Sequence, residues 1–342
     1  MRVLVTGASG MLGGAVADRL AERGENVVVM QRRSVGTRSA GTRSSGMRHT
    51  EVLGDVADPD AVNAAVADVD AVVHLAAKVD IVGRWAEYAA VNIEGTRNVI
   101  SAARAHGVSR LVYVSSPSVA HSGASIVGAG ATVADPRVRG HYARSKAMAE
   151  RLALSAHSSE LAVSAIRPHL VWGPGDTQLV GRIVARARAG RLALVGSGAA
   201  LVDTTYVDNA AAAIVAALDR IEVAGGQALV VTNGEPRPIG ELVADICRAC
   251  GAPPPRLRVP YPVAWSVGGV VETVAAASER LPLVPAITQP PLTRFLAGQL
   301  ATAHWFDQRH TRDVLQWRPQ VSISEGLDSL RRHTEATGSG VR

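Results

Sequence analysis

Short apolar runs alternate with segments of helical spacing along the first half of the chain. The runs that predict strands are 2–6, 27–31, 71–75 and 111–115, and those that predict helices are 12–23, 59–67 and 91–105. Strands that are apolar throughout are buried on both faces, and helices are the crossovers that parallel strands need. The pattern therefore predicts an α/β fold, a Rossmann-type doubly wound parallel sheet with helices on both faces.

Composition excludes several other classes of protein. The 342 residues are 47% hydrophobic and 19% charged, which rules out a disordered chain. Two cysteines cannot form a disulfide scaffold, and neither a signal peptide nor an apolar stretch of about 20 residues is present. We therefore expect a cytoplasmic protein.

The net charge of +6 favours anionic partners, but it does not indicate a nucleic-acid protein. The basic residues are scattered, and no basic patch is interleaved with aromatic residues. The exception is 36–48, where glycine, serine, threonine and arginine nearly repeat and predict a mobile basic loop. Only two basic residues, Lys78 and Lys146, are lysines; the other basic positions are arginine.

A glycine-rich turn stands between the first predicted strand and the first predicted helix. Gly7, Gly10 and Gly13 are spaced G-x-x-G-x-x-G in the sequence TGASGMLG at 6–13, with Ser9 and Met11 between them. Such a turn lets the backbone approach a pyrophosphate at the helix N-terminus, whose free N–H groups attract anions. A purely structural turn is the alternative. The position between strand and helix favours dinucleotide binding.

The end of the second strand indicates which dinucleotide binds. A carboxylate there suits the ribose of NAD, whereas arginine suits the 2′-phosphate of NADP. The sequence has Gln31, Arg32 and Arg33, with no acid before Glu51. We therefore predict NADP(H), with Arg32 and Arg33 as phosphate ligands; a solvated basic loop is the alternative.

Two further positions after strands are candidate cofactor contacts. Asp55, followed by Val56, comes after the third strand, where it either meets the adenine amino group or caps the helix ahead of Pro59. Ala76 and Ala77 follow the fourth strand, where small side chains let a cofactor lie against the backbone.

Tyr142 and Lys146 give the sharpest chemical signal. At i and i+4 they share one face of a helix, and a nearby cation lowers the pKa of a phenol towards the range useful for acid–base catalysis. A Y-x-x-x-K string also arises by chance. Here, however, a predicted strand 26 residues upstream ends in Ser115 and Ser116; we favour Ser116 for the substrate carbonyl and Ser115 for bracing the turn.

With these motifs in order, the chain resembles the extended short-chain dehydrogenase/reductases, in their 3β-hydroxysteroid dehydrogenase/isomerase branch. The matching segments run nearly end to end: TGASGMLG at 6–13, HLAA at 74–77, VNIEGTRNV at 91–99, VSSPSV at 114–119, YARSK at 142–146, RPHLVWGPGD at 167–176 and TYVDNAAAA at 205–213. The resemblance implies Ser116, Tyr142 and Lys146 as the catalytic set, the latter two also contacting cofactor. It implies that Asn92 holds a water in a proton relay.

Within that branch the tail is most similar to the members that reduce 2-alkyl-3-oxoalkanoic acids in bacterial long-chain olefin biosynthesis. The segments that carry this similarity are KVDIVGRW at 78–85, LVGSGAALVDTTYVDNAA at 194–211, PPLTRFLAGQLATAHWFD at 290–307 and WRPQVSISEGL at 317–327. The resemblance implies an NADPH-dependent ketone reductase for a lipid-like keto acid, with a homodimer, assembly with pathway enzymes and peripheral membrane contact as further expectations. A 3β-hydroxysteroid dehydrogenase and a non-catalytic NADP(H) sensor are the alternatives.

The expected domain division follows from these motifs. Residues 1–168, with 204–233 returning to them, are expected to form the NADP-binding Rossmann domain, and 169–203 with 234–342 a smaller substrate-binding lobe.

Three further features of the sequence give weaker indications. Cys247 and Cys250 have no second pair to complete a zinc site, His121 and His141 are candidate pocket residues, and the apolar run 263–271 predicts a lid helix or a surface contact.

Overall fold

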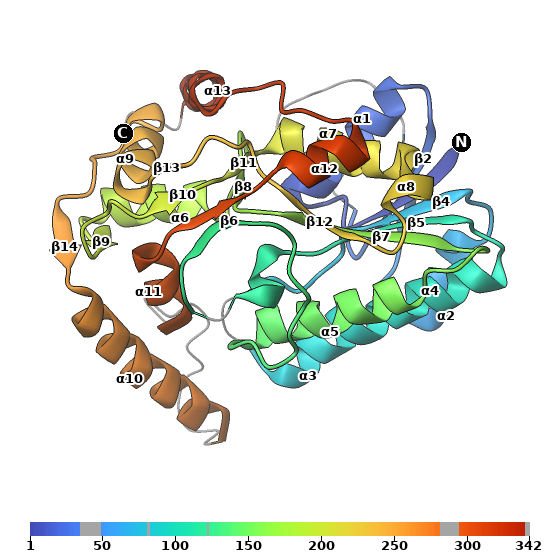
Figure 1. The fold of residues 1–342 in the computed structure, drawn as a ribbon, viewed down its shortest axis with the longest axis horizontal. Helices are drawn as coiled ribbons and strands as arrows, with labels where there is room; N and C mark the ends of the chain where they lie inside the picture. The colour runs from blue at the N-terminus through green and yellow to red at the C-terminus, as the bar shows by residue number, and fades with distance from the viewer. Residues whose placement is uncertain (35–48, 81–82, 122, 281–293, 339–342) are drawn as a thin grey trace.

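A seven-stranded parallel sheet forms the centre of the molecule (Figure 1). The computed structural model describes residues 1–34, 49–80, 83–121, 123–280 and 294–338. The strand order is β12-β7-β5-β4-β1-β2-β3. The bounds are β1 Arg2–Thr6, β2 Asn26–Gln31, β3 Thr50–Leu53, β4 Ala71–His74, β5 Arg110–Val114, β7 Ala162–Pro168 and β12 Ala228–Val231. This confirms the predicted doubly wound α/β fold.

Helices cover both faces of this sheet. On one face lie α1 (Met11–Glu22), α7 (Val207–Asp219), α8 (Ile221–Ala224) and α12 (Arg309–Leu315), and on the other lie α2 (Pro59–Val66), α4 (Gly95–Ala105) and α5 (His141–Ser155). Successive residues of a strand point to opposite faces, so Val3 and Val5 pack into one core and Leu4 into the other. The sheet is therefore apolar on both sides, as its sequence predicts.

The helix predicted over 91–105 is the one that differs most from expectation. A short helix α3 (Trp85–Tyr88) continues into a π-helical turn η1 (Ala89–Glu94) before α4 begins. Single π-turns within helices are frequent at functional sites. The other predicted strands and helices lie within two residues of their expected ends.

The remaining strands form smaller sheets beside the carboxyl ends of the central strands. A four-stranded sheet has the order β13 (Arg237–Pro238), β10 (Leu201–Val202), β15 (His304–Phe306) and β6 (Ile126–Ala129). Two-stranded pairs join β11 (Thr205–Tyr206) to β8 (Val171–Trp172) and β14 (Leu257–Val259) to β9 (Ala193–Val195). The pairing of β6 with β15 brings the C-terminal tail beside the segment that follows β5.

The other helices lie around these smaller sheets. They are α6 (Val180–Arg188), α9 (Ile239–Ala249), α10 (Tyr261–Arg280), α11 (Arg294–Ala301) and α13 (Ile323–Ala336), with a 3₁₀ turn η2 (Pro117–Ala120) after β5. The predicted apolar run 263–271 belongs to α10, at the edge of the molecule in Figure 1, where Val263, Val267 and Val270 are exposed. It is thus a surface helix in this structure, and none of the residues 263–271 lines the pocket described below.

The loop predicted at 36–48 lies outside the described residues. Cys247 and Cys250 are buried free thiols in α9 and at its end, and burial raises the pKa of Cys247 to about 11. Among the described residues no cluster could hold a metal ion, and no helix is both long and apolar enough to cross a bilayer.

Candidate active site

The glycine turn after β1 has the geometry that a dinucleotide site requires. Gly7 has φ +76°, and a Cβ on it would lie 2.8 Å from the backbone nitrogen of Ala76. A Cβ on Gly13 would lie 2.3 Å from the carbonyl oxygen of Gly7, so this glycine lets α1 approach the turn. Gly10 differs, since a Cβ there would meet only the Gly7 oxygen at 3.5 Å. The turn is therefore tightly packed at Gly7 and Gly13, whereas the space beside Gly10 is open.

The N-terminus of α1 faces this open side. Its N-cap is Gly10, which has no side chain to cap the helix, and no acidic residue stands in the first turn. Ser9 and Gly10 are exposed, and Met11 is half-buried. Uncapped backbone N–H groups at a helix N-terminus bind phosphate oxygens. The residues present therefore fit the pyrophosphate of a nicotinamide dinucleotide.

Three residues behind the turn fix its position against the sheet. Thr6 Oγ1 lies 2.7 Å from His74 Nδ1 and accepts a hydrogen bond of 3.1 Å from the Ala76 backbone. His74 Nε2 lies 3.2 Å from Thr96 Oγ1 on α4. This buried chain holds Ala76 and its half-buried neighbour Ala77 beside Gly7, as the cofactor prediction needs.

The end of β2 carries Arg32 and Arg33, both exposed. The buried Gln31 before them donates a side-chain hydrogen bond to the carboxylate of Glu51 on β3. Glu51 pairs with Val29 in the sheet register, so an acid that is distant in sequence comes next to the end of β2. Sequence spacing alone does not reveal this carboxylate.

Asp55 stands in a turn after β3, and it is not a helix cap. Its Oδ1 accepts a hydrogen bond of 3.0 Å from the Ala57 backbone, whereas the N-cap of α2 is Asp58, which accepts from Asp60 and Ala61. The capping alternative for Asp55 is therefore wrong. Val56 is buried, and its side chain packs against Gly95 at the start of α4.

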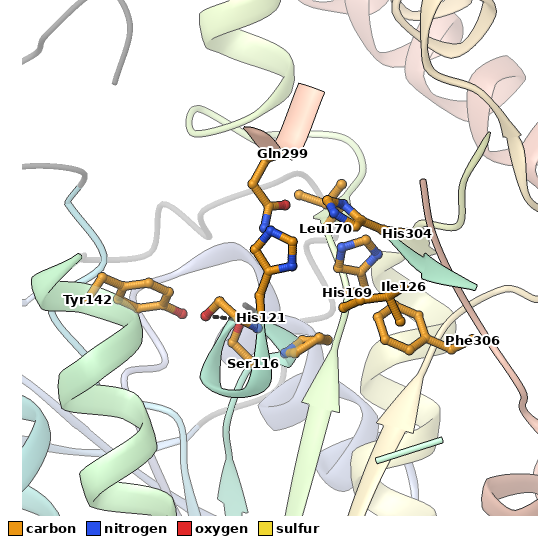
Figure 2. Close-up of a pocket in the computed structure, with 11 residues that line it drawn as sticks. Ser116, His121, Ile126, Tyr142, His169, Leu170, Gln299, His304 and Phe306 are labelled. Atoms are coloured by element: carbon orange, nitrogen blue, oxygen red, sulfur yellow. Dashed lines mark hydrogen bonds between the residues drawn. The ribbon is translucent and has the colours of Figure 1, made fainter. Parts of the chain in front are cut away.

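Ser116 and Tyr142 meet in one pocket, as the sequence predicts. Ser116 caps the 3₁₀ turn η2, where its Oγ accepts hydrogen bonds from the Ser118 backbone and hydroxyl, the latter at 3.0 Å. Ser115 does not brace this turn with its side chain, because its buried hydroxyl has no hydrogen-bond partner among the described residues. Tyr142 lies in the first turn of α5 with its hydroxyl towards η2 (Figure 2).

The pKa of Tyr142 moves in the opposite direction from the one expected from a nearby cation. Burial raises it, and the hydrogen bond with Ser116 opposes this only in part. In this structure the phenol is thus held in its protonated form at neutral pH. A protonated phenol is a proton donor, not a base.

Lys146 lies one turn further along α5, and it is buried, with 2% of its surface exposed. Its Nζ donates a hydrogen bond of 2.7 Å to the carbonyl oxygen of Val114 and lies 4.2 Å from the centre of the Tyr113 ring. Burial lowers the pKa of Lys146 to about 7, although Glu150 opposes the shift. The Lys146 side chain is thus held in a closed site at the end of β5.

Asn92 occupies the π-turn η1 and is almost fully buried. Its Oδ1 accepts from the Lys78 backbone at 2.7 Å, and its Nδ2 donates to the Lys78 carbonyl at 3.1 Å and to Ser145 Oγ at 2.8 Å. Ser145 Oγ in turn donates to the carbonyl of Tyr142. In this structure Asn92 therefore ties the segment that follows β4 to α5.

The pocket beside Ser116 and Tyr142 contains residues that the sequence analysis did not select. Its cavity of about 140 Å³ is lined by Ser116, Pro117, Ser118, His121, Ile126, Tyr142, His169, Leu170, Gln299, His304 and Phe306. His121 lines it as predicted. His141 does not, since its ring lies against Trp85 and Tyr88. His169 lies within a segment matched to the family pattern, which is the signal that could have identified it.

Comparison with known proteins identifies the family. Residues 4–261 match the model of the 3-beta hydroxysteroid dehydrogenase/isomerase family. The chain belongs to this family. It is therefore an oxidoreductase of CH–OH and ketone groups, as its motifs predict.

Relatives within the 3-beta hydroxysteroid dehydrogenase/isomerase family cover nearly all of the chain. A 2-alkyl-3-oxoalkanoate reductase of Stenotrophomonas maltophilia is 43% identical over 98% of this chain and 100% of its own length. A second one, of Shewanella oneidensis, is 37% identical over 96% of this chain and 84% of its own length. UDP-glucuronic acid 4-epimerase of Bacillus cereus, solved with NAD, shares the fold with a TM-score of 0.75 at 20% identity, covering 100% and 99% of the two chains.

Proposed function

We propose that this protein uses NADPH to reduce the 3-keto group of a 2-alkyl-3-oxoalkanoic acid to the 3-hydroxy acid, in long-chain olefin biosynthesis. The observation that carries the proposal is the meeting of Ser116 and Tyr142 in one pocket, with Lys146 buried one helical turn away. The names of the two relatives support the substrate class.

Each residue of this set has a role that its surroundings support. Ser116 donates a hydrogen bond to the substrate carbonyl and orients it, and Tyr142 donates the proton to the carbonyl oxygen. The hydride for the carbonyl carbon would come from NADPH when it is bound. Because the phenol of Tyr142 is protonated at neutral pH, it holds the proton that reduction of the carbonyl needs. Lys146 would hold the nicotinamide ribose of a bound cofactor, and Asn92 acts as a positioning residue for α5.

The proposed cofactor site includes the glycine turn, Asp55, Val56, Ala76 and Ala77. We assign it to residues 1–168 with 204–233, and the substrate lobe to 169–203 with 234–342. The pocket supports this division, because Ser116 and Tyr142 come from the first part and His169, Gln299 and His304 from the second. The predicted homodimer, the assembly with other enzymes and the peripheral membrane contact stay predictions of the sequence.

A substrate panel tests the proposed function. Purified protein is offered 2-alkyl-3-oxo acids with NADPH or NADH, and 3β-hydroxysteroids with the oxidised cofactors. We expect NADPH oxidation with the keto acids and at least about tenfold less activity with the sterols. Sterol oxidation alone would replace the proposal by a 3β-hydroxysteroid dehydrogenase. Cofactor binding without turnover of either class would indicate a sensor.

Cofactor choice is expected to depend on Arg32 and Arg33. Replacing both with serine removes charge-assisted contacts to the 2′-phosphate worth about 1.5–3 kcal/mol each, so Kd for NADPH should rise far more than Kd for NADH. Fluorescence titration of both cofactors measures this. The double replacement of Arg331 and Arg332, exposed on α13, is the control for general positive charge. Equal losses for both cofactors would contradict the assignment and leave Glu51 as the ribose contact.

The chain provides an internal control for Lys146. Because its Nζ sits in a closed site against Val114 and Tyr113, the broader guanidinium of Lys146→Arg should not fit. We expect loss of most activity and weaker NADPH binding. Lys78→Arg, at the other lysine, keeps its ion pairs with Asp80 and Glu87 and should remain close to wild type. Steady-state kinetics of both variants decide whether the ammonium itself is required.

A further inference from the structure

The buried ammonium of Lys146 has no carboxylate of its own. Lys146 is 2% exposed, and it forms no ion pair within the part of the chain that the structure describes. Glu150, one turn further along α5, is the partner that helical spacing would favour. Both of its carboxylate oxygens instead accept hydrogen bonds from the guanidinium of Arg167 on β7. Because a buried charge without a partner is costly, the placing of this ammonium needs another cause.

The aromatic ring of Tyr113 lies where a carboxylate partner would otherwise be needed. The Nζ atom of Lys146 is 4.2 Å from the centre of this ring, a distance at which a cation is attracted to the negative ring face. The same Nζ donates a hydrogen bond to the carbonyl oxygen of Val114, the next residue of β5. A ring face attracts the ammonium without neutralising it. The charge therefore stays in place for a cofactor.

Tyr113 can fix a cation because its own position is fixed. It is 1% exposed and packs into the core between the central sheet and α5. Its partner in the sheet register is His74 on β4, and the two ring centres lie 5.8 Å apart. His74 belongs to the hydrogen-bonded chain behind the glycine turn. The ring of Tyr113 thus contacts both the support of that turn and Lys146.

We propose that Tyr113 is a positioning residue of the active site, whose ring face holds the ammonium of Lys146 at the end of β5, where it can meet the nicotinamide ribose. This rests on the proposed function, because the ribose contact of Lys146 is part of it. The role belongs to the ring face. Phenylalanine supplies such a face as well, whereas an aliphatic side chain does not.

The contact has a consequence for the charge of Lys146. Burial lowers the pKa of this lysine to about 7, although Glu150 opposes the shift. A ring face favours the charged form, so the pKa should fall further when the ring is removed. Less of the protein then carries the ammonium at pH 7 and above, and NADPH binding should weaken most there. At about pH 5 the ammonium is formed with or without the ring, so the difference should become smaller.

The groups packed around this ammonium come from four elements. They are Tyr142 and Glu150 on α5, Tyr113 on β5, His74 on β4 and Arg167 on β7. Burial lowers the pKa of His74 to about 3 and raises the pKa values of Tyr113 and Tyr142. These three rings are therefore neutral near pH 7, and Glu150 is paired with Arg167. A titration of Lys146 near neutral pH can thus be followed without theirs.

The presence of only two lysines in the chain allows the ammonium to be observed directly. Protein labelled with ¹³C-lysine gives two ε-carbon NMR signals, and Lys78→Arg identifies the signal of Lys146. In Tyr113→Leu we expect the pKa read from that signal to fall by about one pH unit, and Kd for NADPH at pH 8 to rise about tenfold. Tyr113→Phe should keep both values. The Lys78 signal, from an ammonium paired with Asp80 and Glu87, is the internal control and should not change.

A second substitution separates the charge distribution of the ring from its packing, and it remains informative if Tyr113→Leu does not fold. Pentafluorophenylalanine incorporated at position 113 has nearly the shape of phenylalanine, but fluorination removes the negative charge from the ring face. Compared with Tyr113→Phe, we expect it to lower the pKa of Lys146 and to weaken NADPH binding. A purely structural role for the ring predicts equal values for the two proteins.

The outcomes distinguish this proposal from the proposed function. An unchanged or raised pKa of Lys146 in Tyr113→Leu, an unchanged Kd for NADPH, or equal values for phenylalanine and its fluorinated form would overturn the role of Tyr113. If Lys146 and NADPH binding respond as expected but the wild-type protein does not reduce the keto acid, Tyr113 keeps its role and the proposed reductase function fails.

Discussion

Replacing Tyr142 with phenylalanine is expected to lower turnover of the keto acid by at least about 100-fold while NADPH still binds. The ring packing in the first turn of α5 is kept, and only the hydroxyl that faces η2 is lost. General acid catalysis by a positioned side chain contributes about 10²–10⁴-fold, so its removal should appear in kcat. Stopped-flow absorbance and fluorescence titration measure the two quantities separately.

A matched control for this variant is Tyr261→Phe on α10, because Tyr261 is partly exposed and does not line the pocket. It should keep wild-type kinetics. A Tyr142→Phe protein with wild-type turnover would show that another group delivers the proton, and Ser116 would be the next residue to replace.

The second large effect concerns stability. Glu150 on α5 and Arg167 on β7 form a buried ion pair, joined by hydrogen bonds of 2.7 and 2.5 Å. Arg167 also donates to the Thr132 carbonyl at 2.7 Å. Removing one partner of a buried pair leaves an uncompensated charge and costs about 3–5 kcal/mol. We expect Arg167→Met to lower the free energy of unfolding in urea by that amount.

A double replacement tests whether the loss comes from the stranded charge. Arg167→Met combined with Glu150→Leu removes both charges, so it should be more stable than Arg167→Met alone. If the double variant is less stable than the single one, the loss comes from packing and from the Thr132 contact. Arg331→Met, in an exposed pair with Glu335 on α13, should change stability by less than about 1 kcal/mol.

The central sheet could be predicted because its signals are local. Each strand is a short apolar run, and the glycine turn marks where β1 passes into α1. The glycine turn, Ser116, Tyr142 and Lys146 could likewise be selected, because each lies at the end of a strand or on one face of a helix. The residues of each motif are close together in the sequence, so their pattern can be recognised without knowing the fold.

The parts that could not be predicted depend on contacts between distant residues. Glu51 reaches the end of β2 through the sheet register, and His304 reaches His121 through the pairing of β6 with β15. The sign that helical spacing with Lys146 predicts for the Tyr142 pKa shift is also wrong, because burial outweighs the effect of the nearby cation. Burial is a property of the packed fold and has no signature in a short motif.

The pairing of β6 with β15 has a consequence for how this enzyme can diversify. Gln299, His304 and Phe306 all come from the short stretch 294–306, which contributes no strand to the seven-stranded sheet. Mutations there can remodel the wall that a substrate meets while the dinucleotide half keeps its own core. Substrate range and cofactor use are thus free to evolve on separate stretches of the same gene.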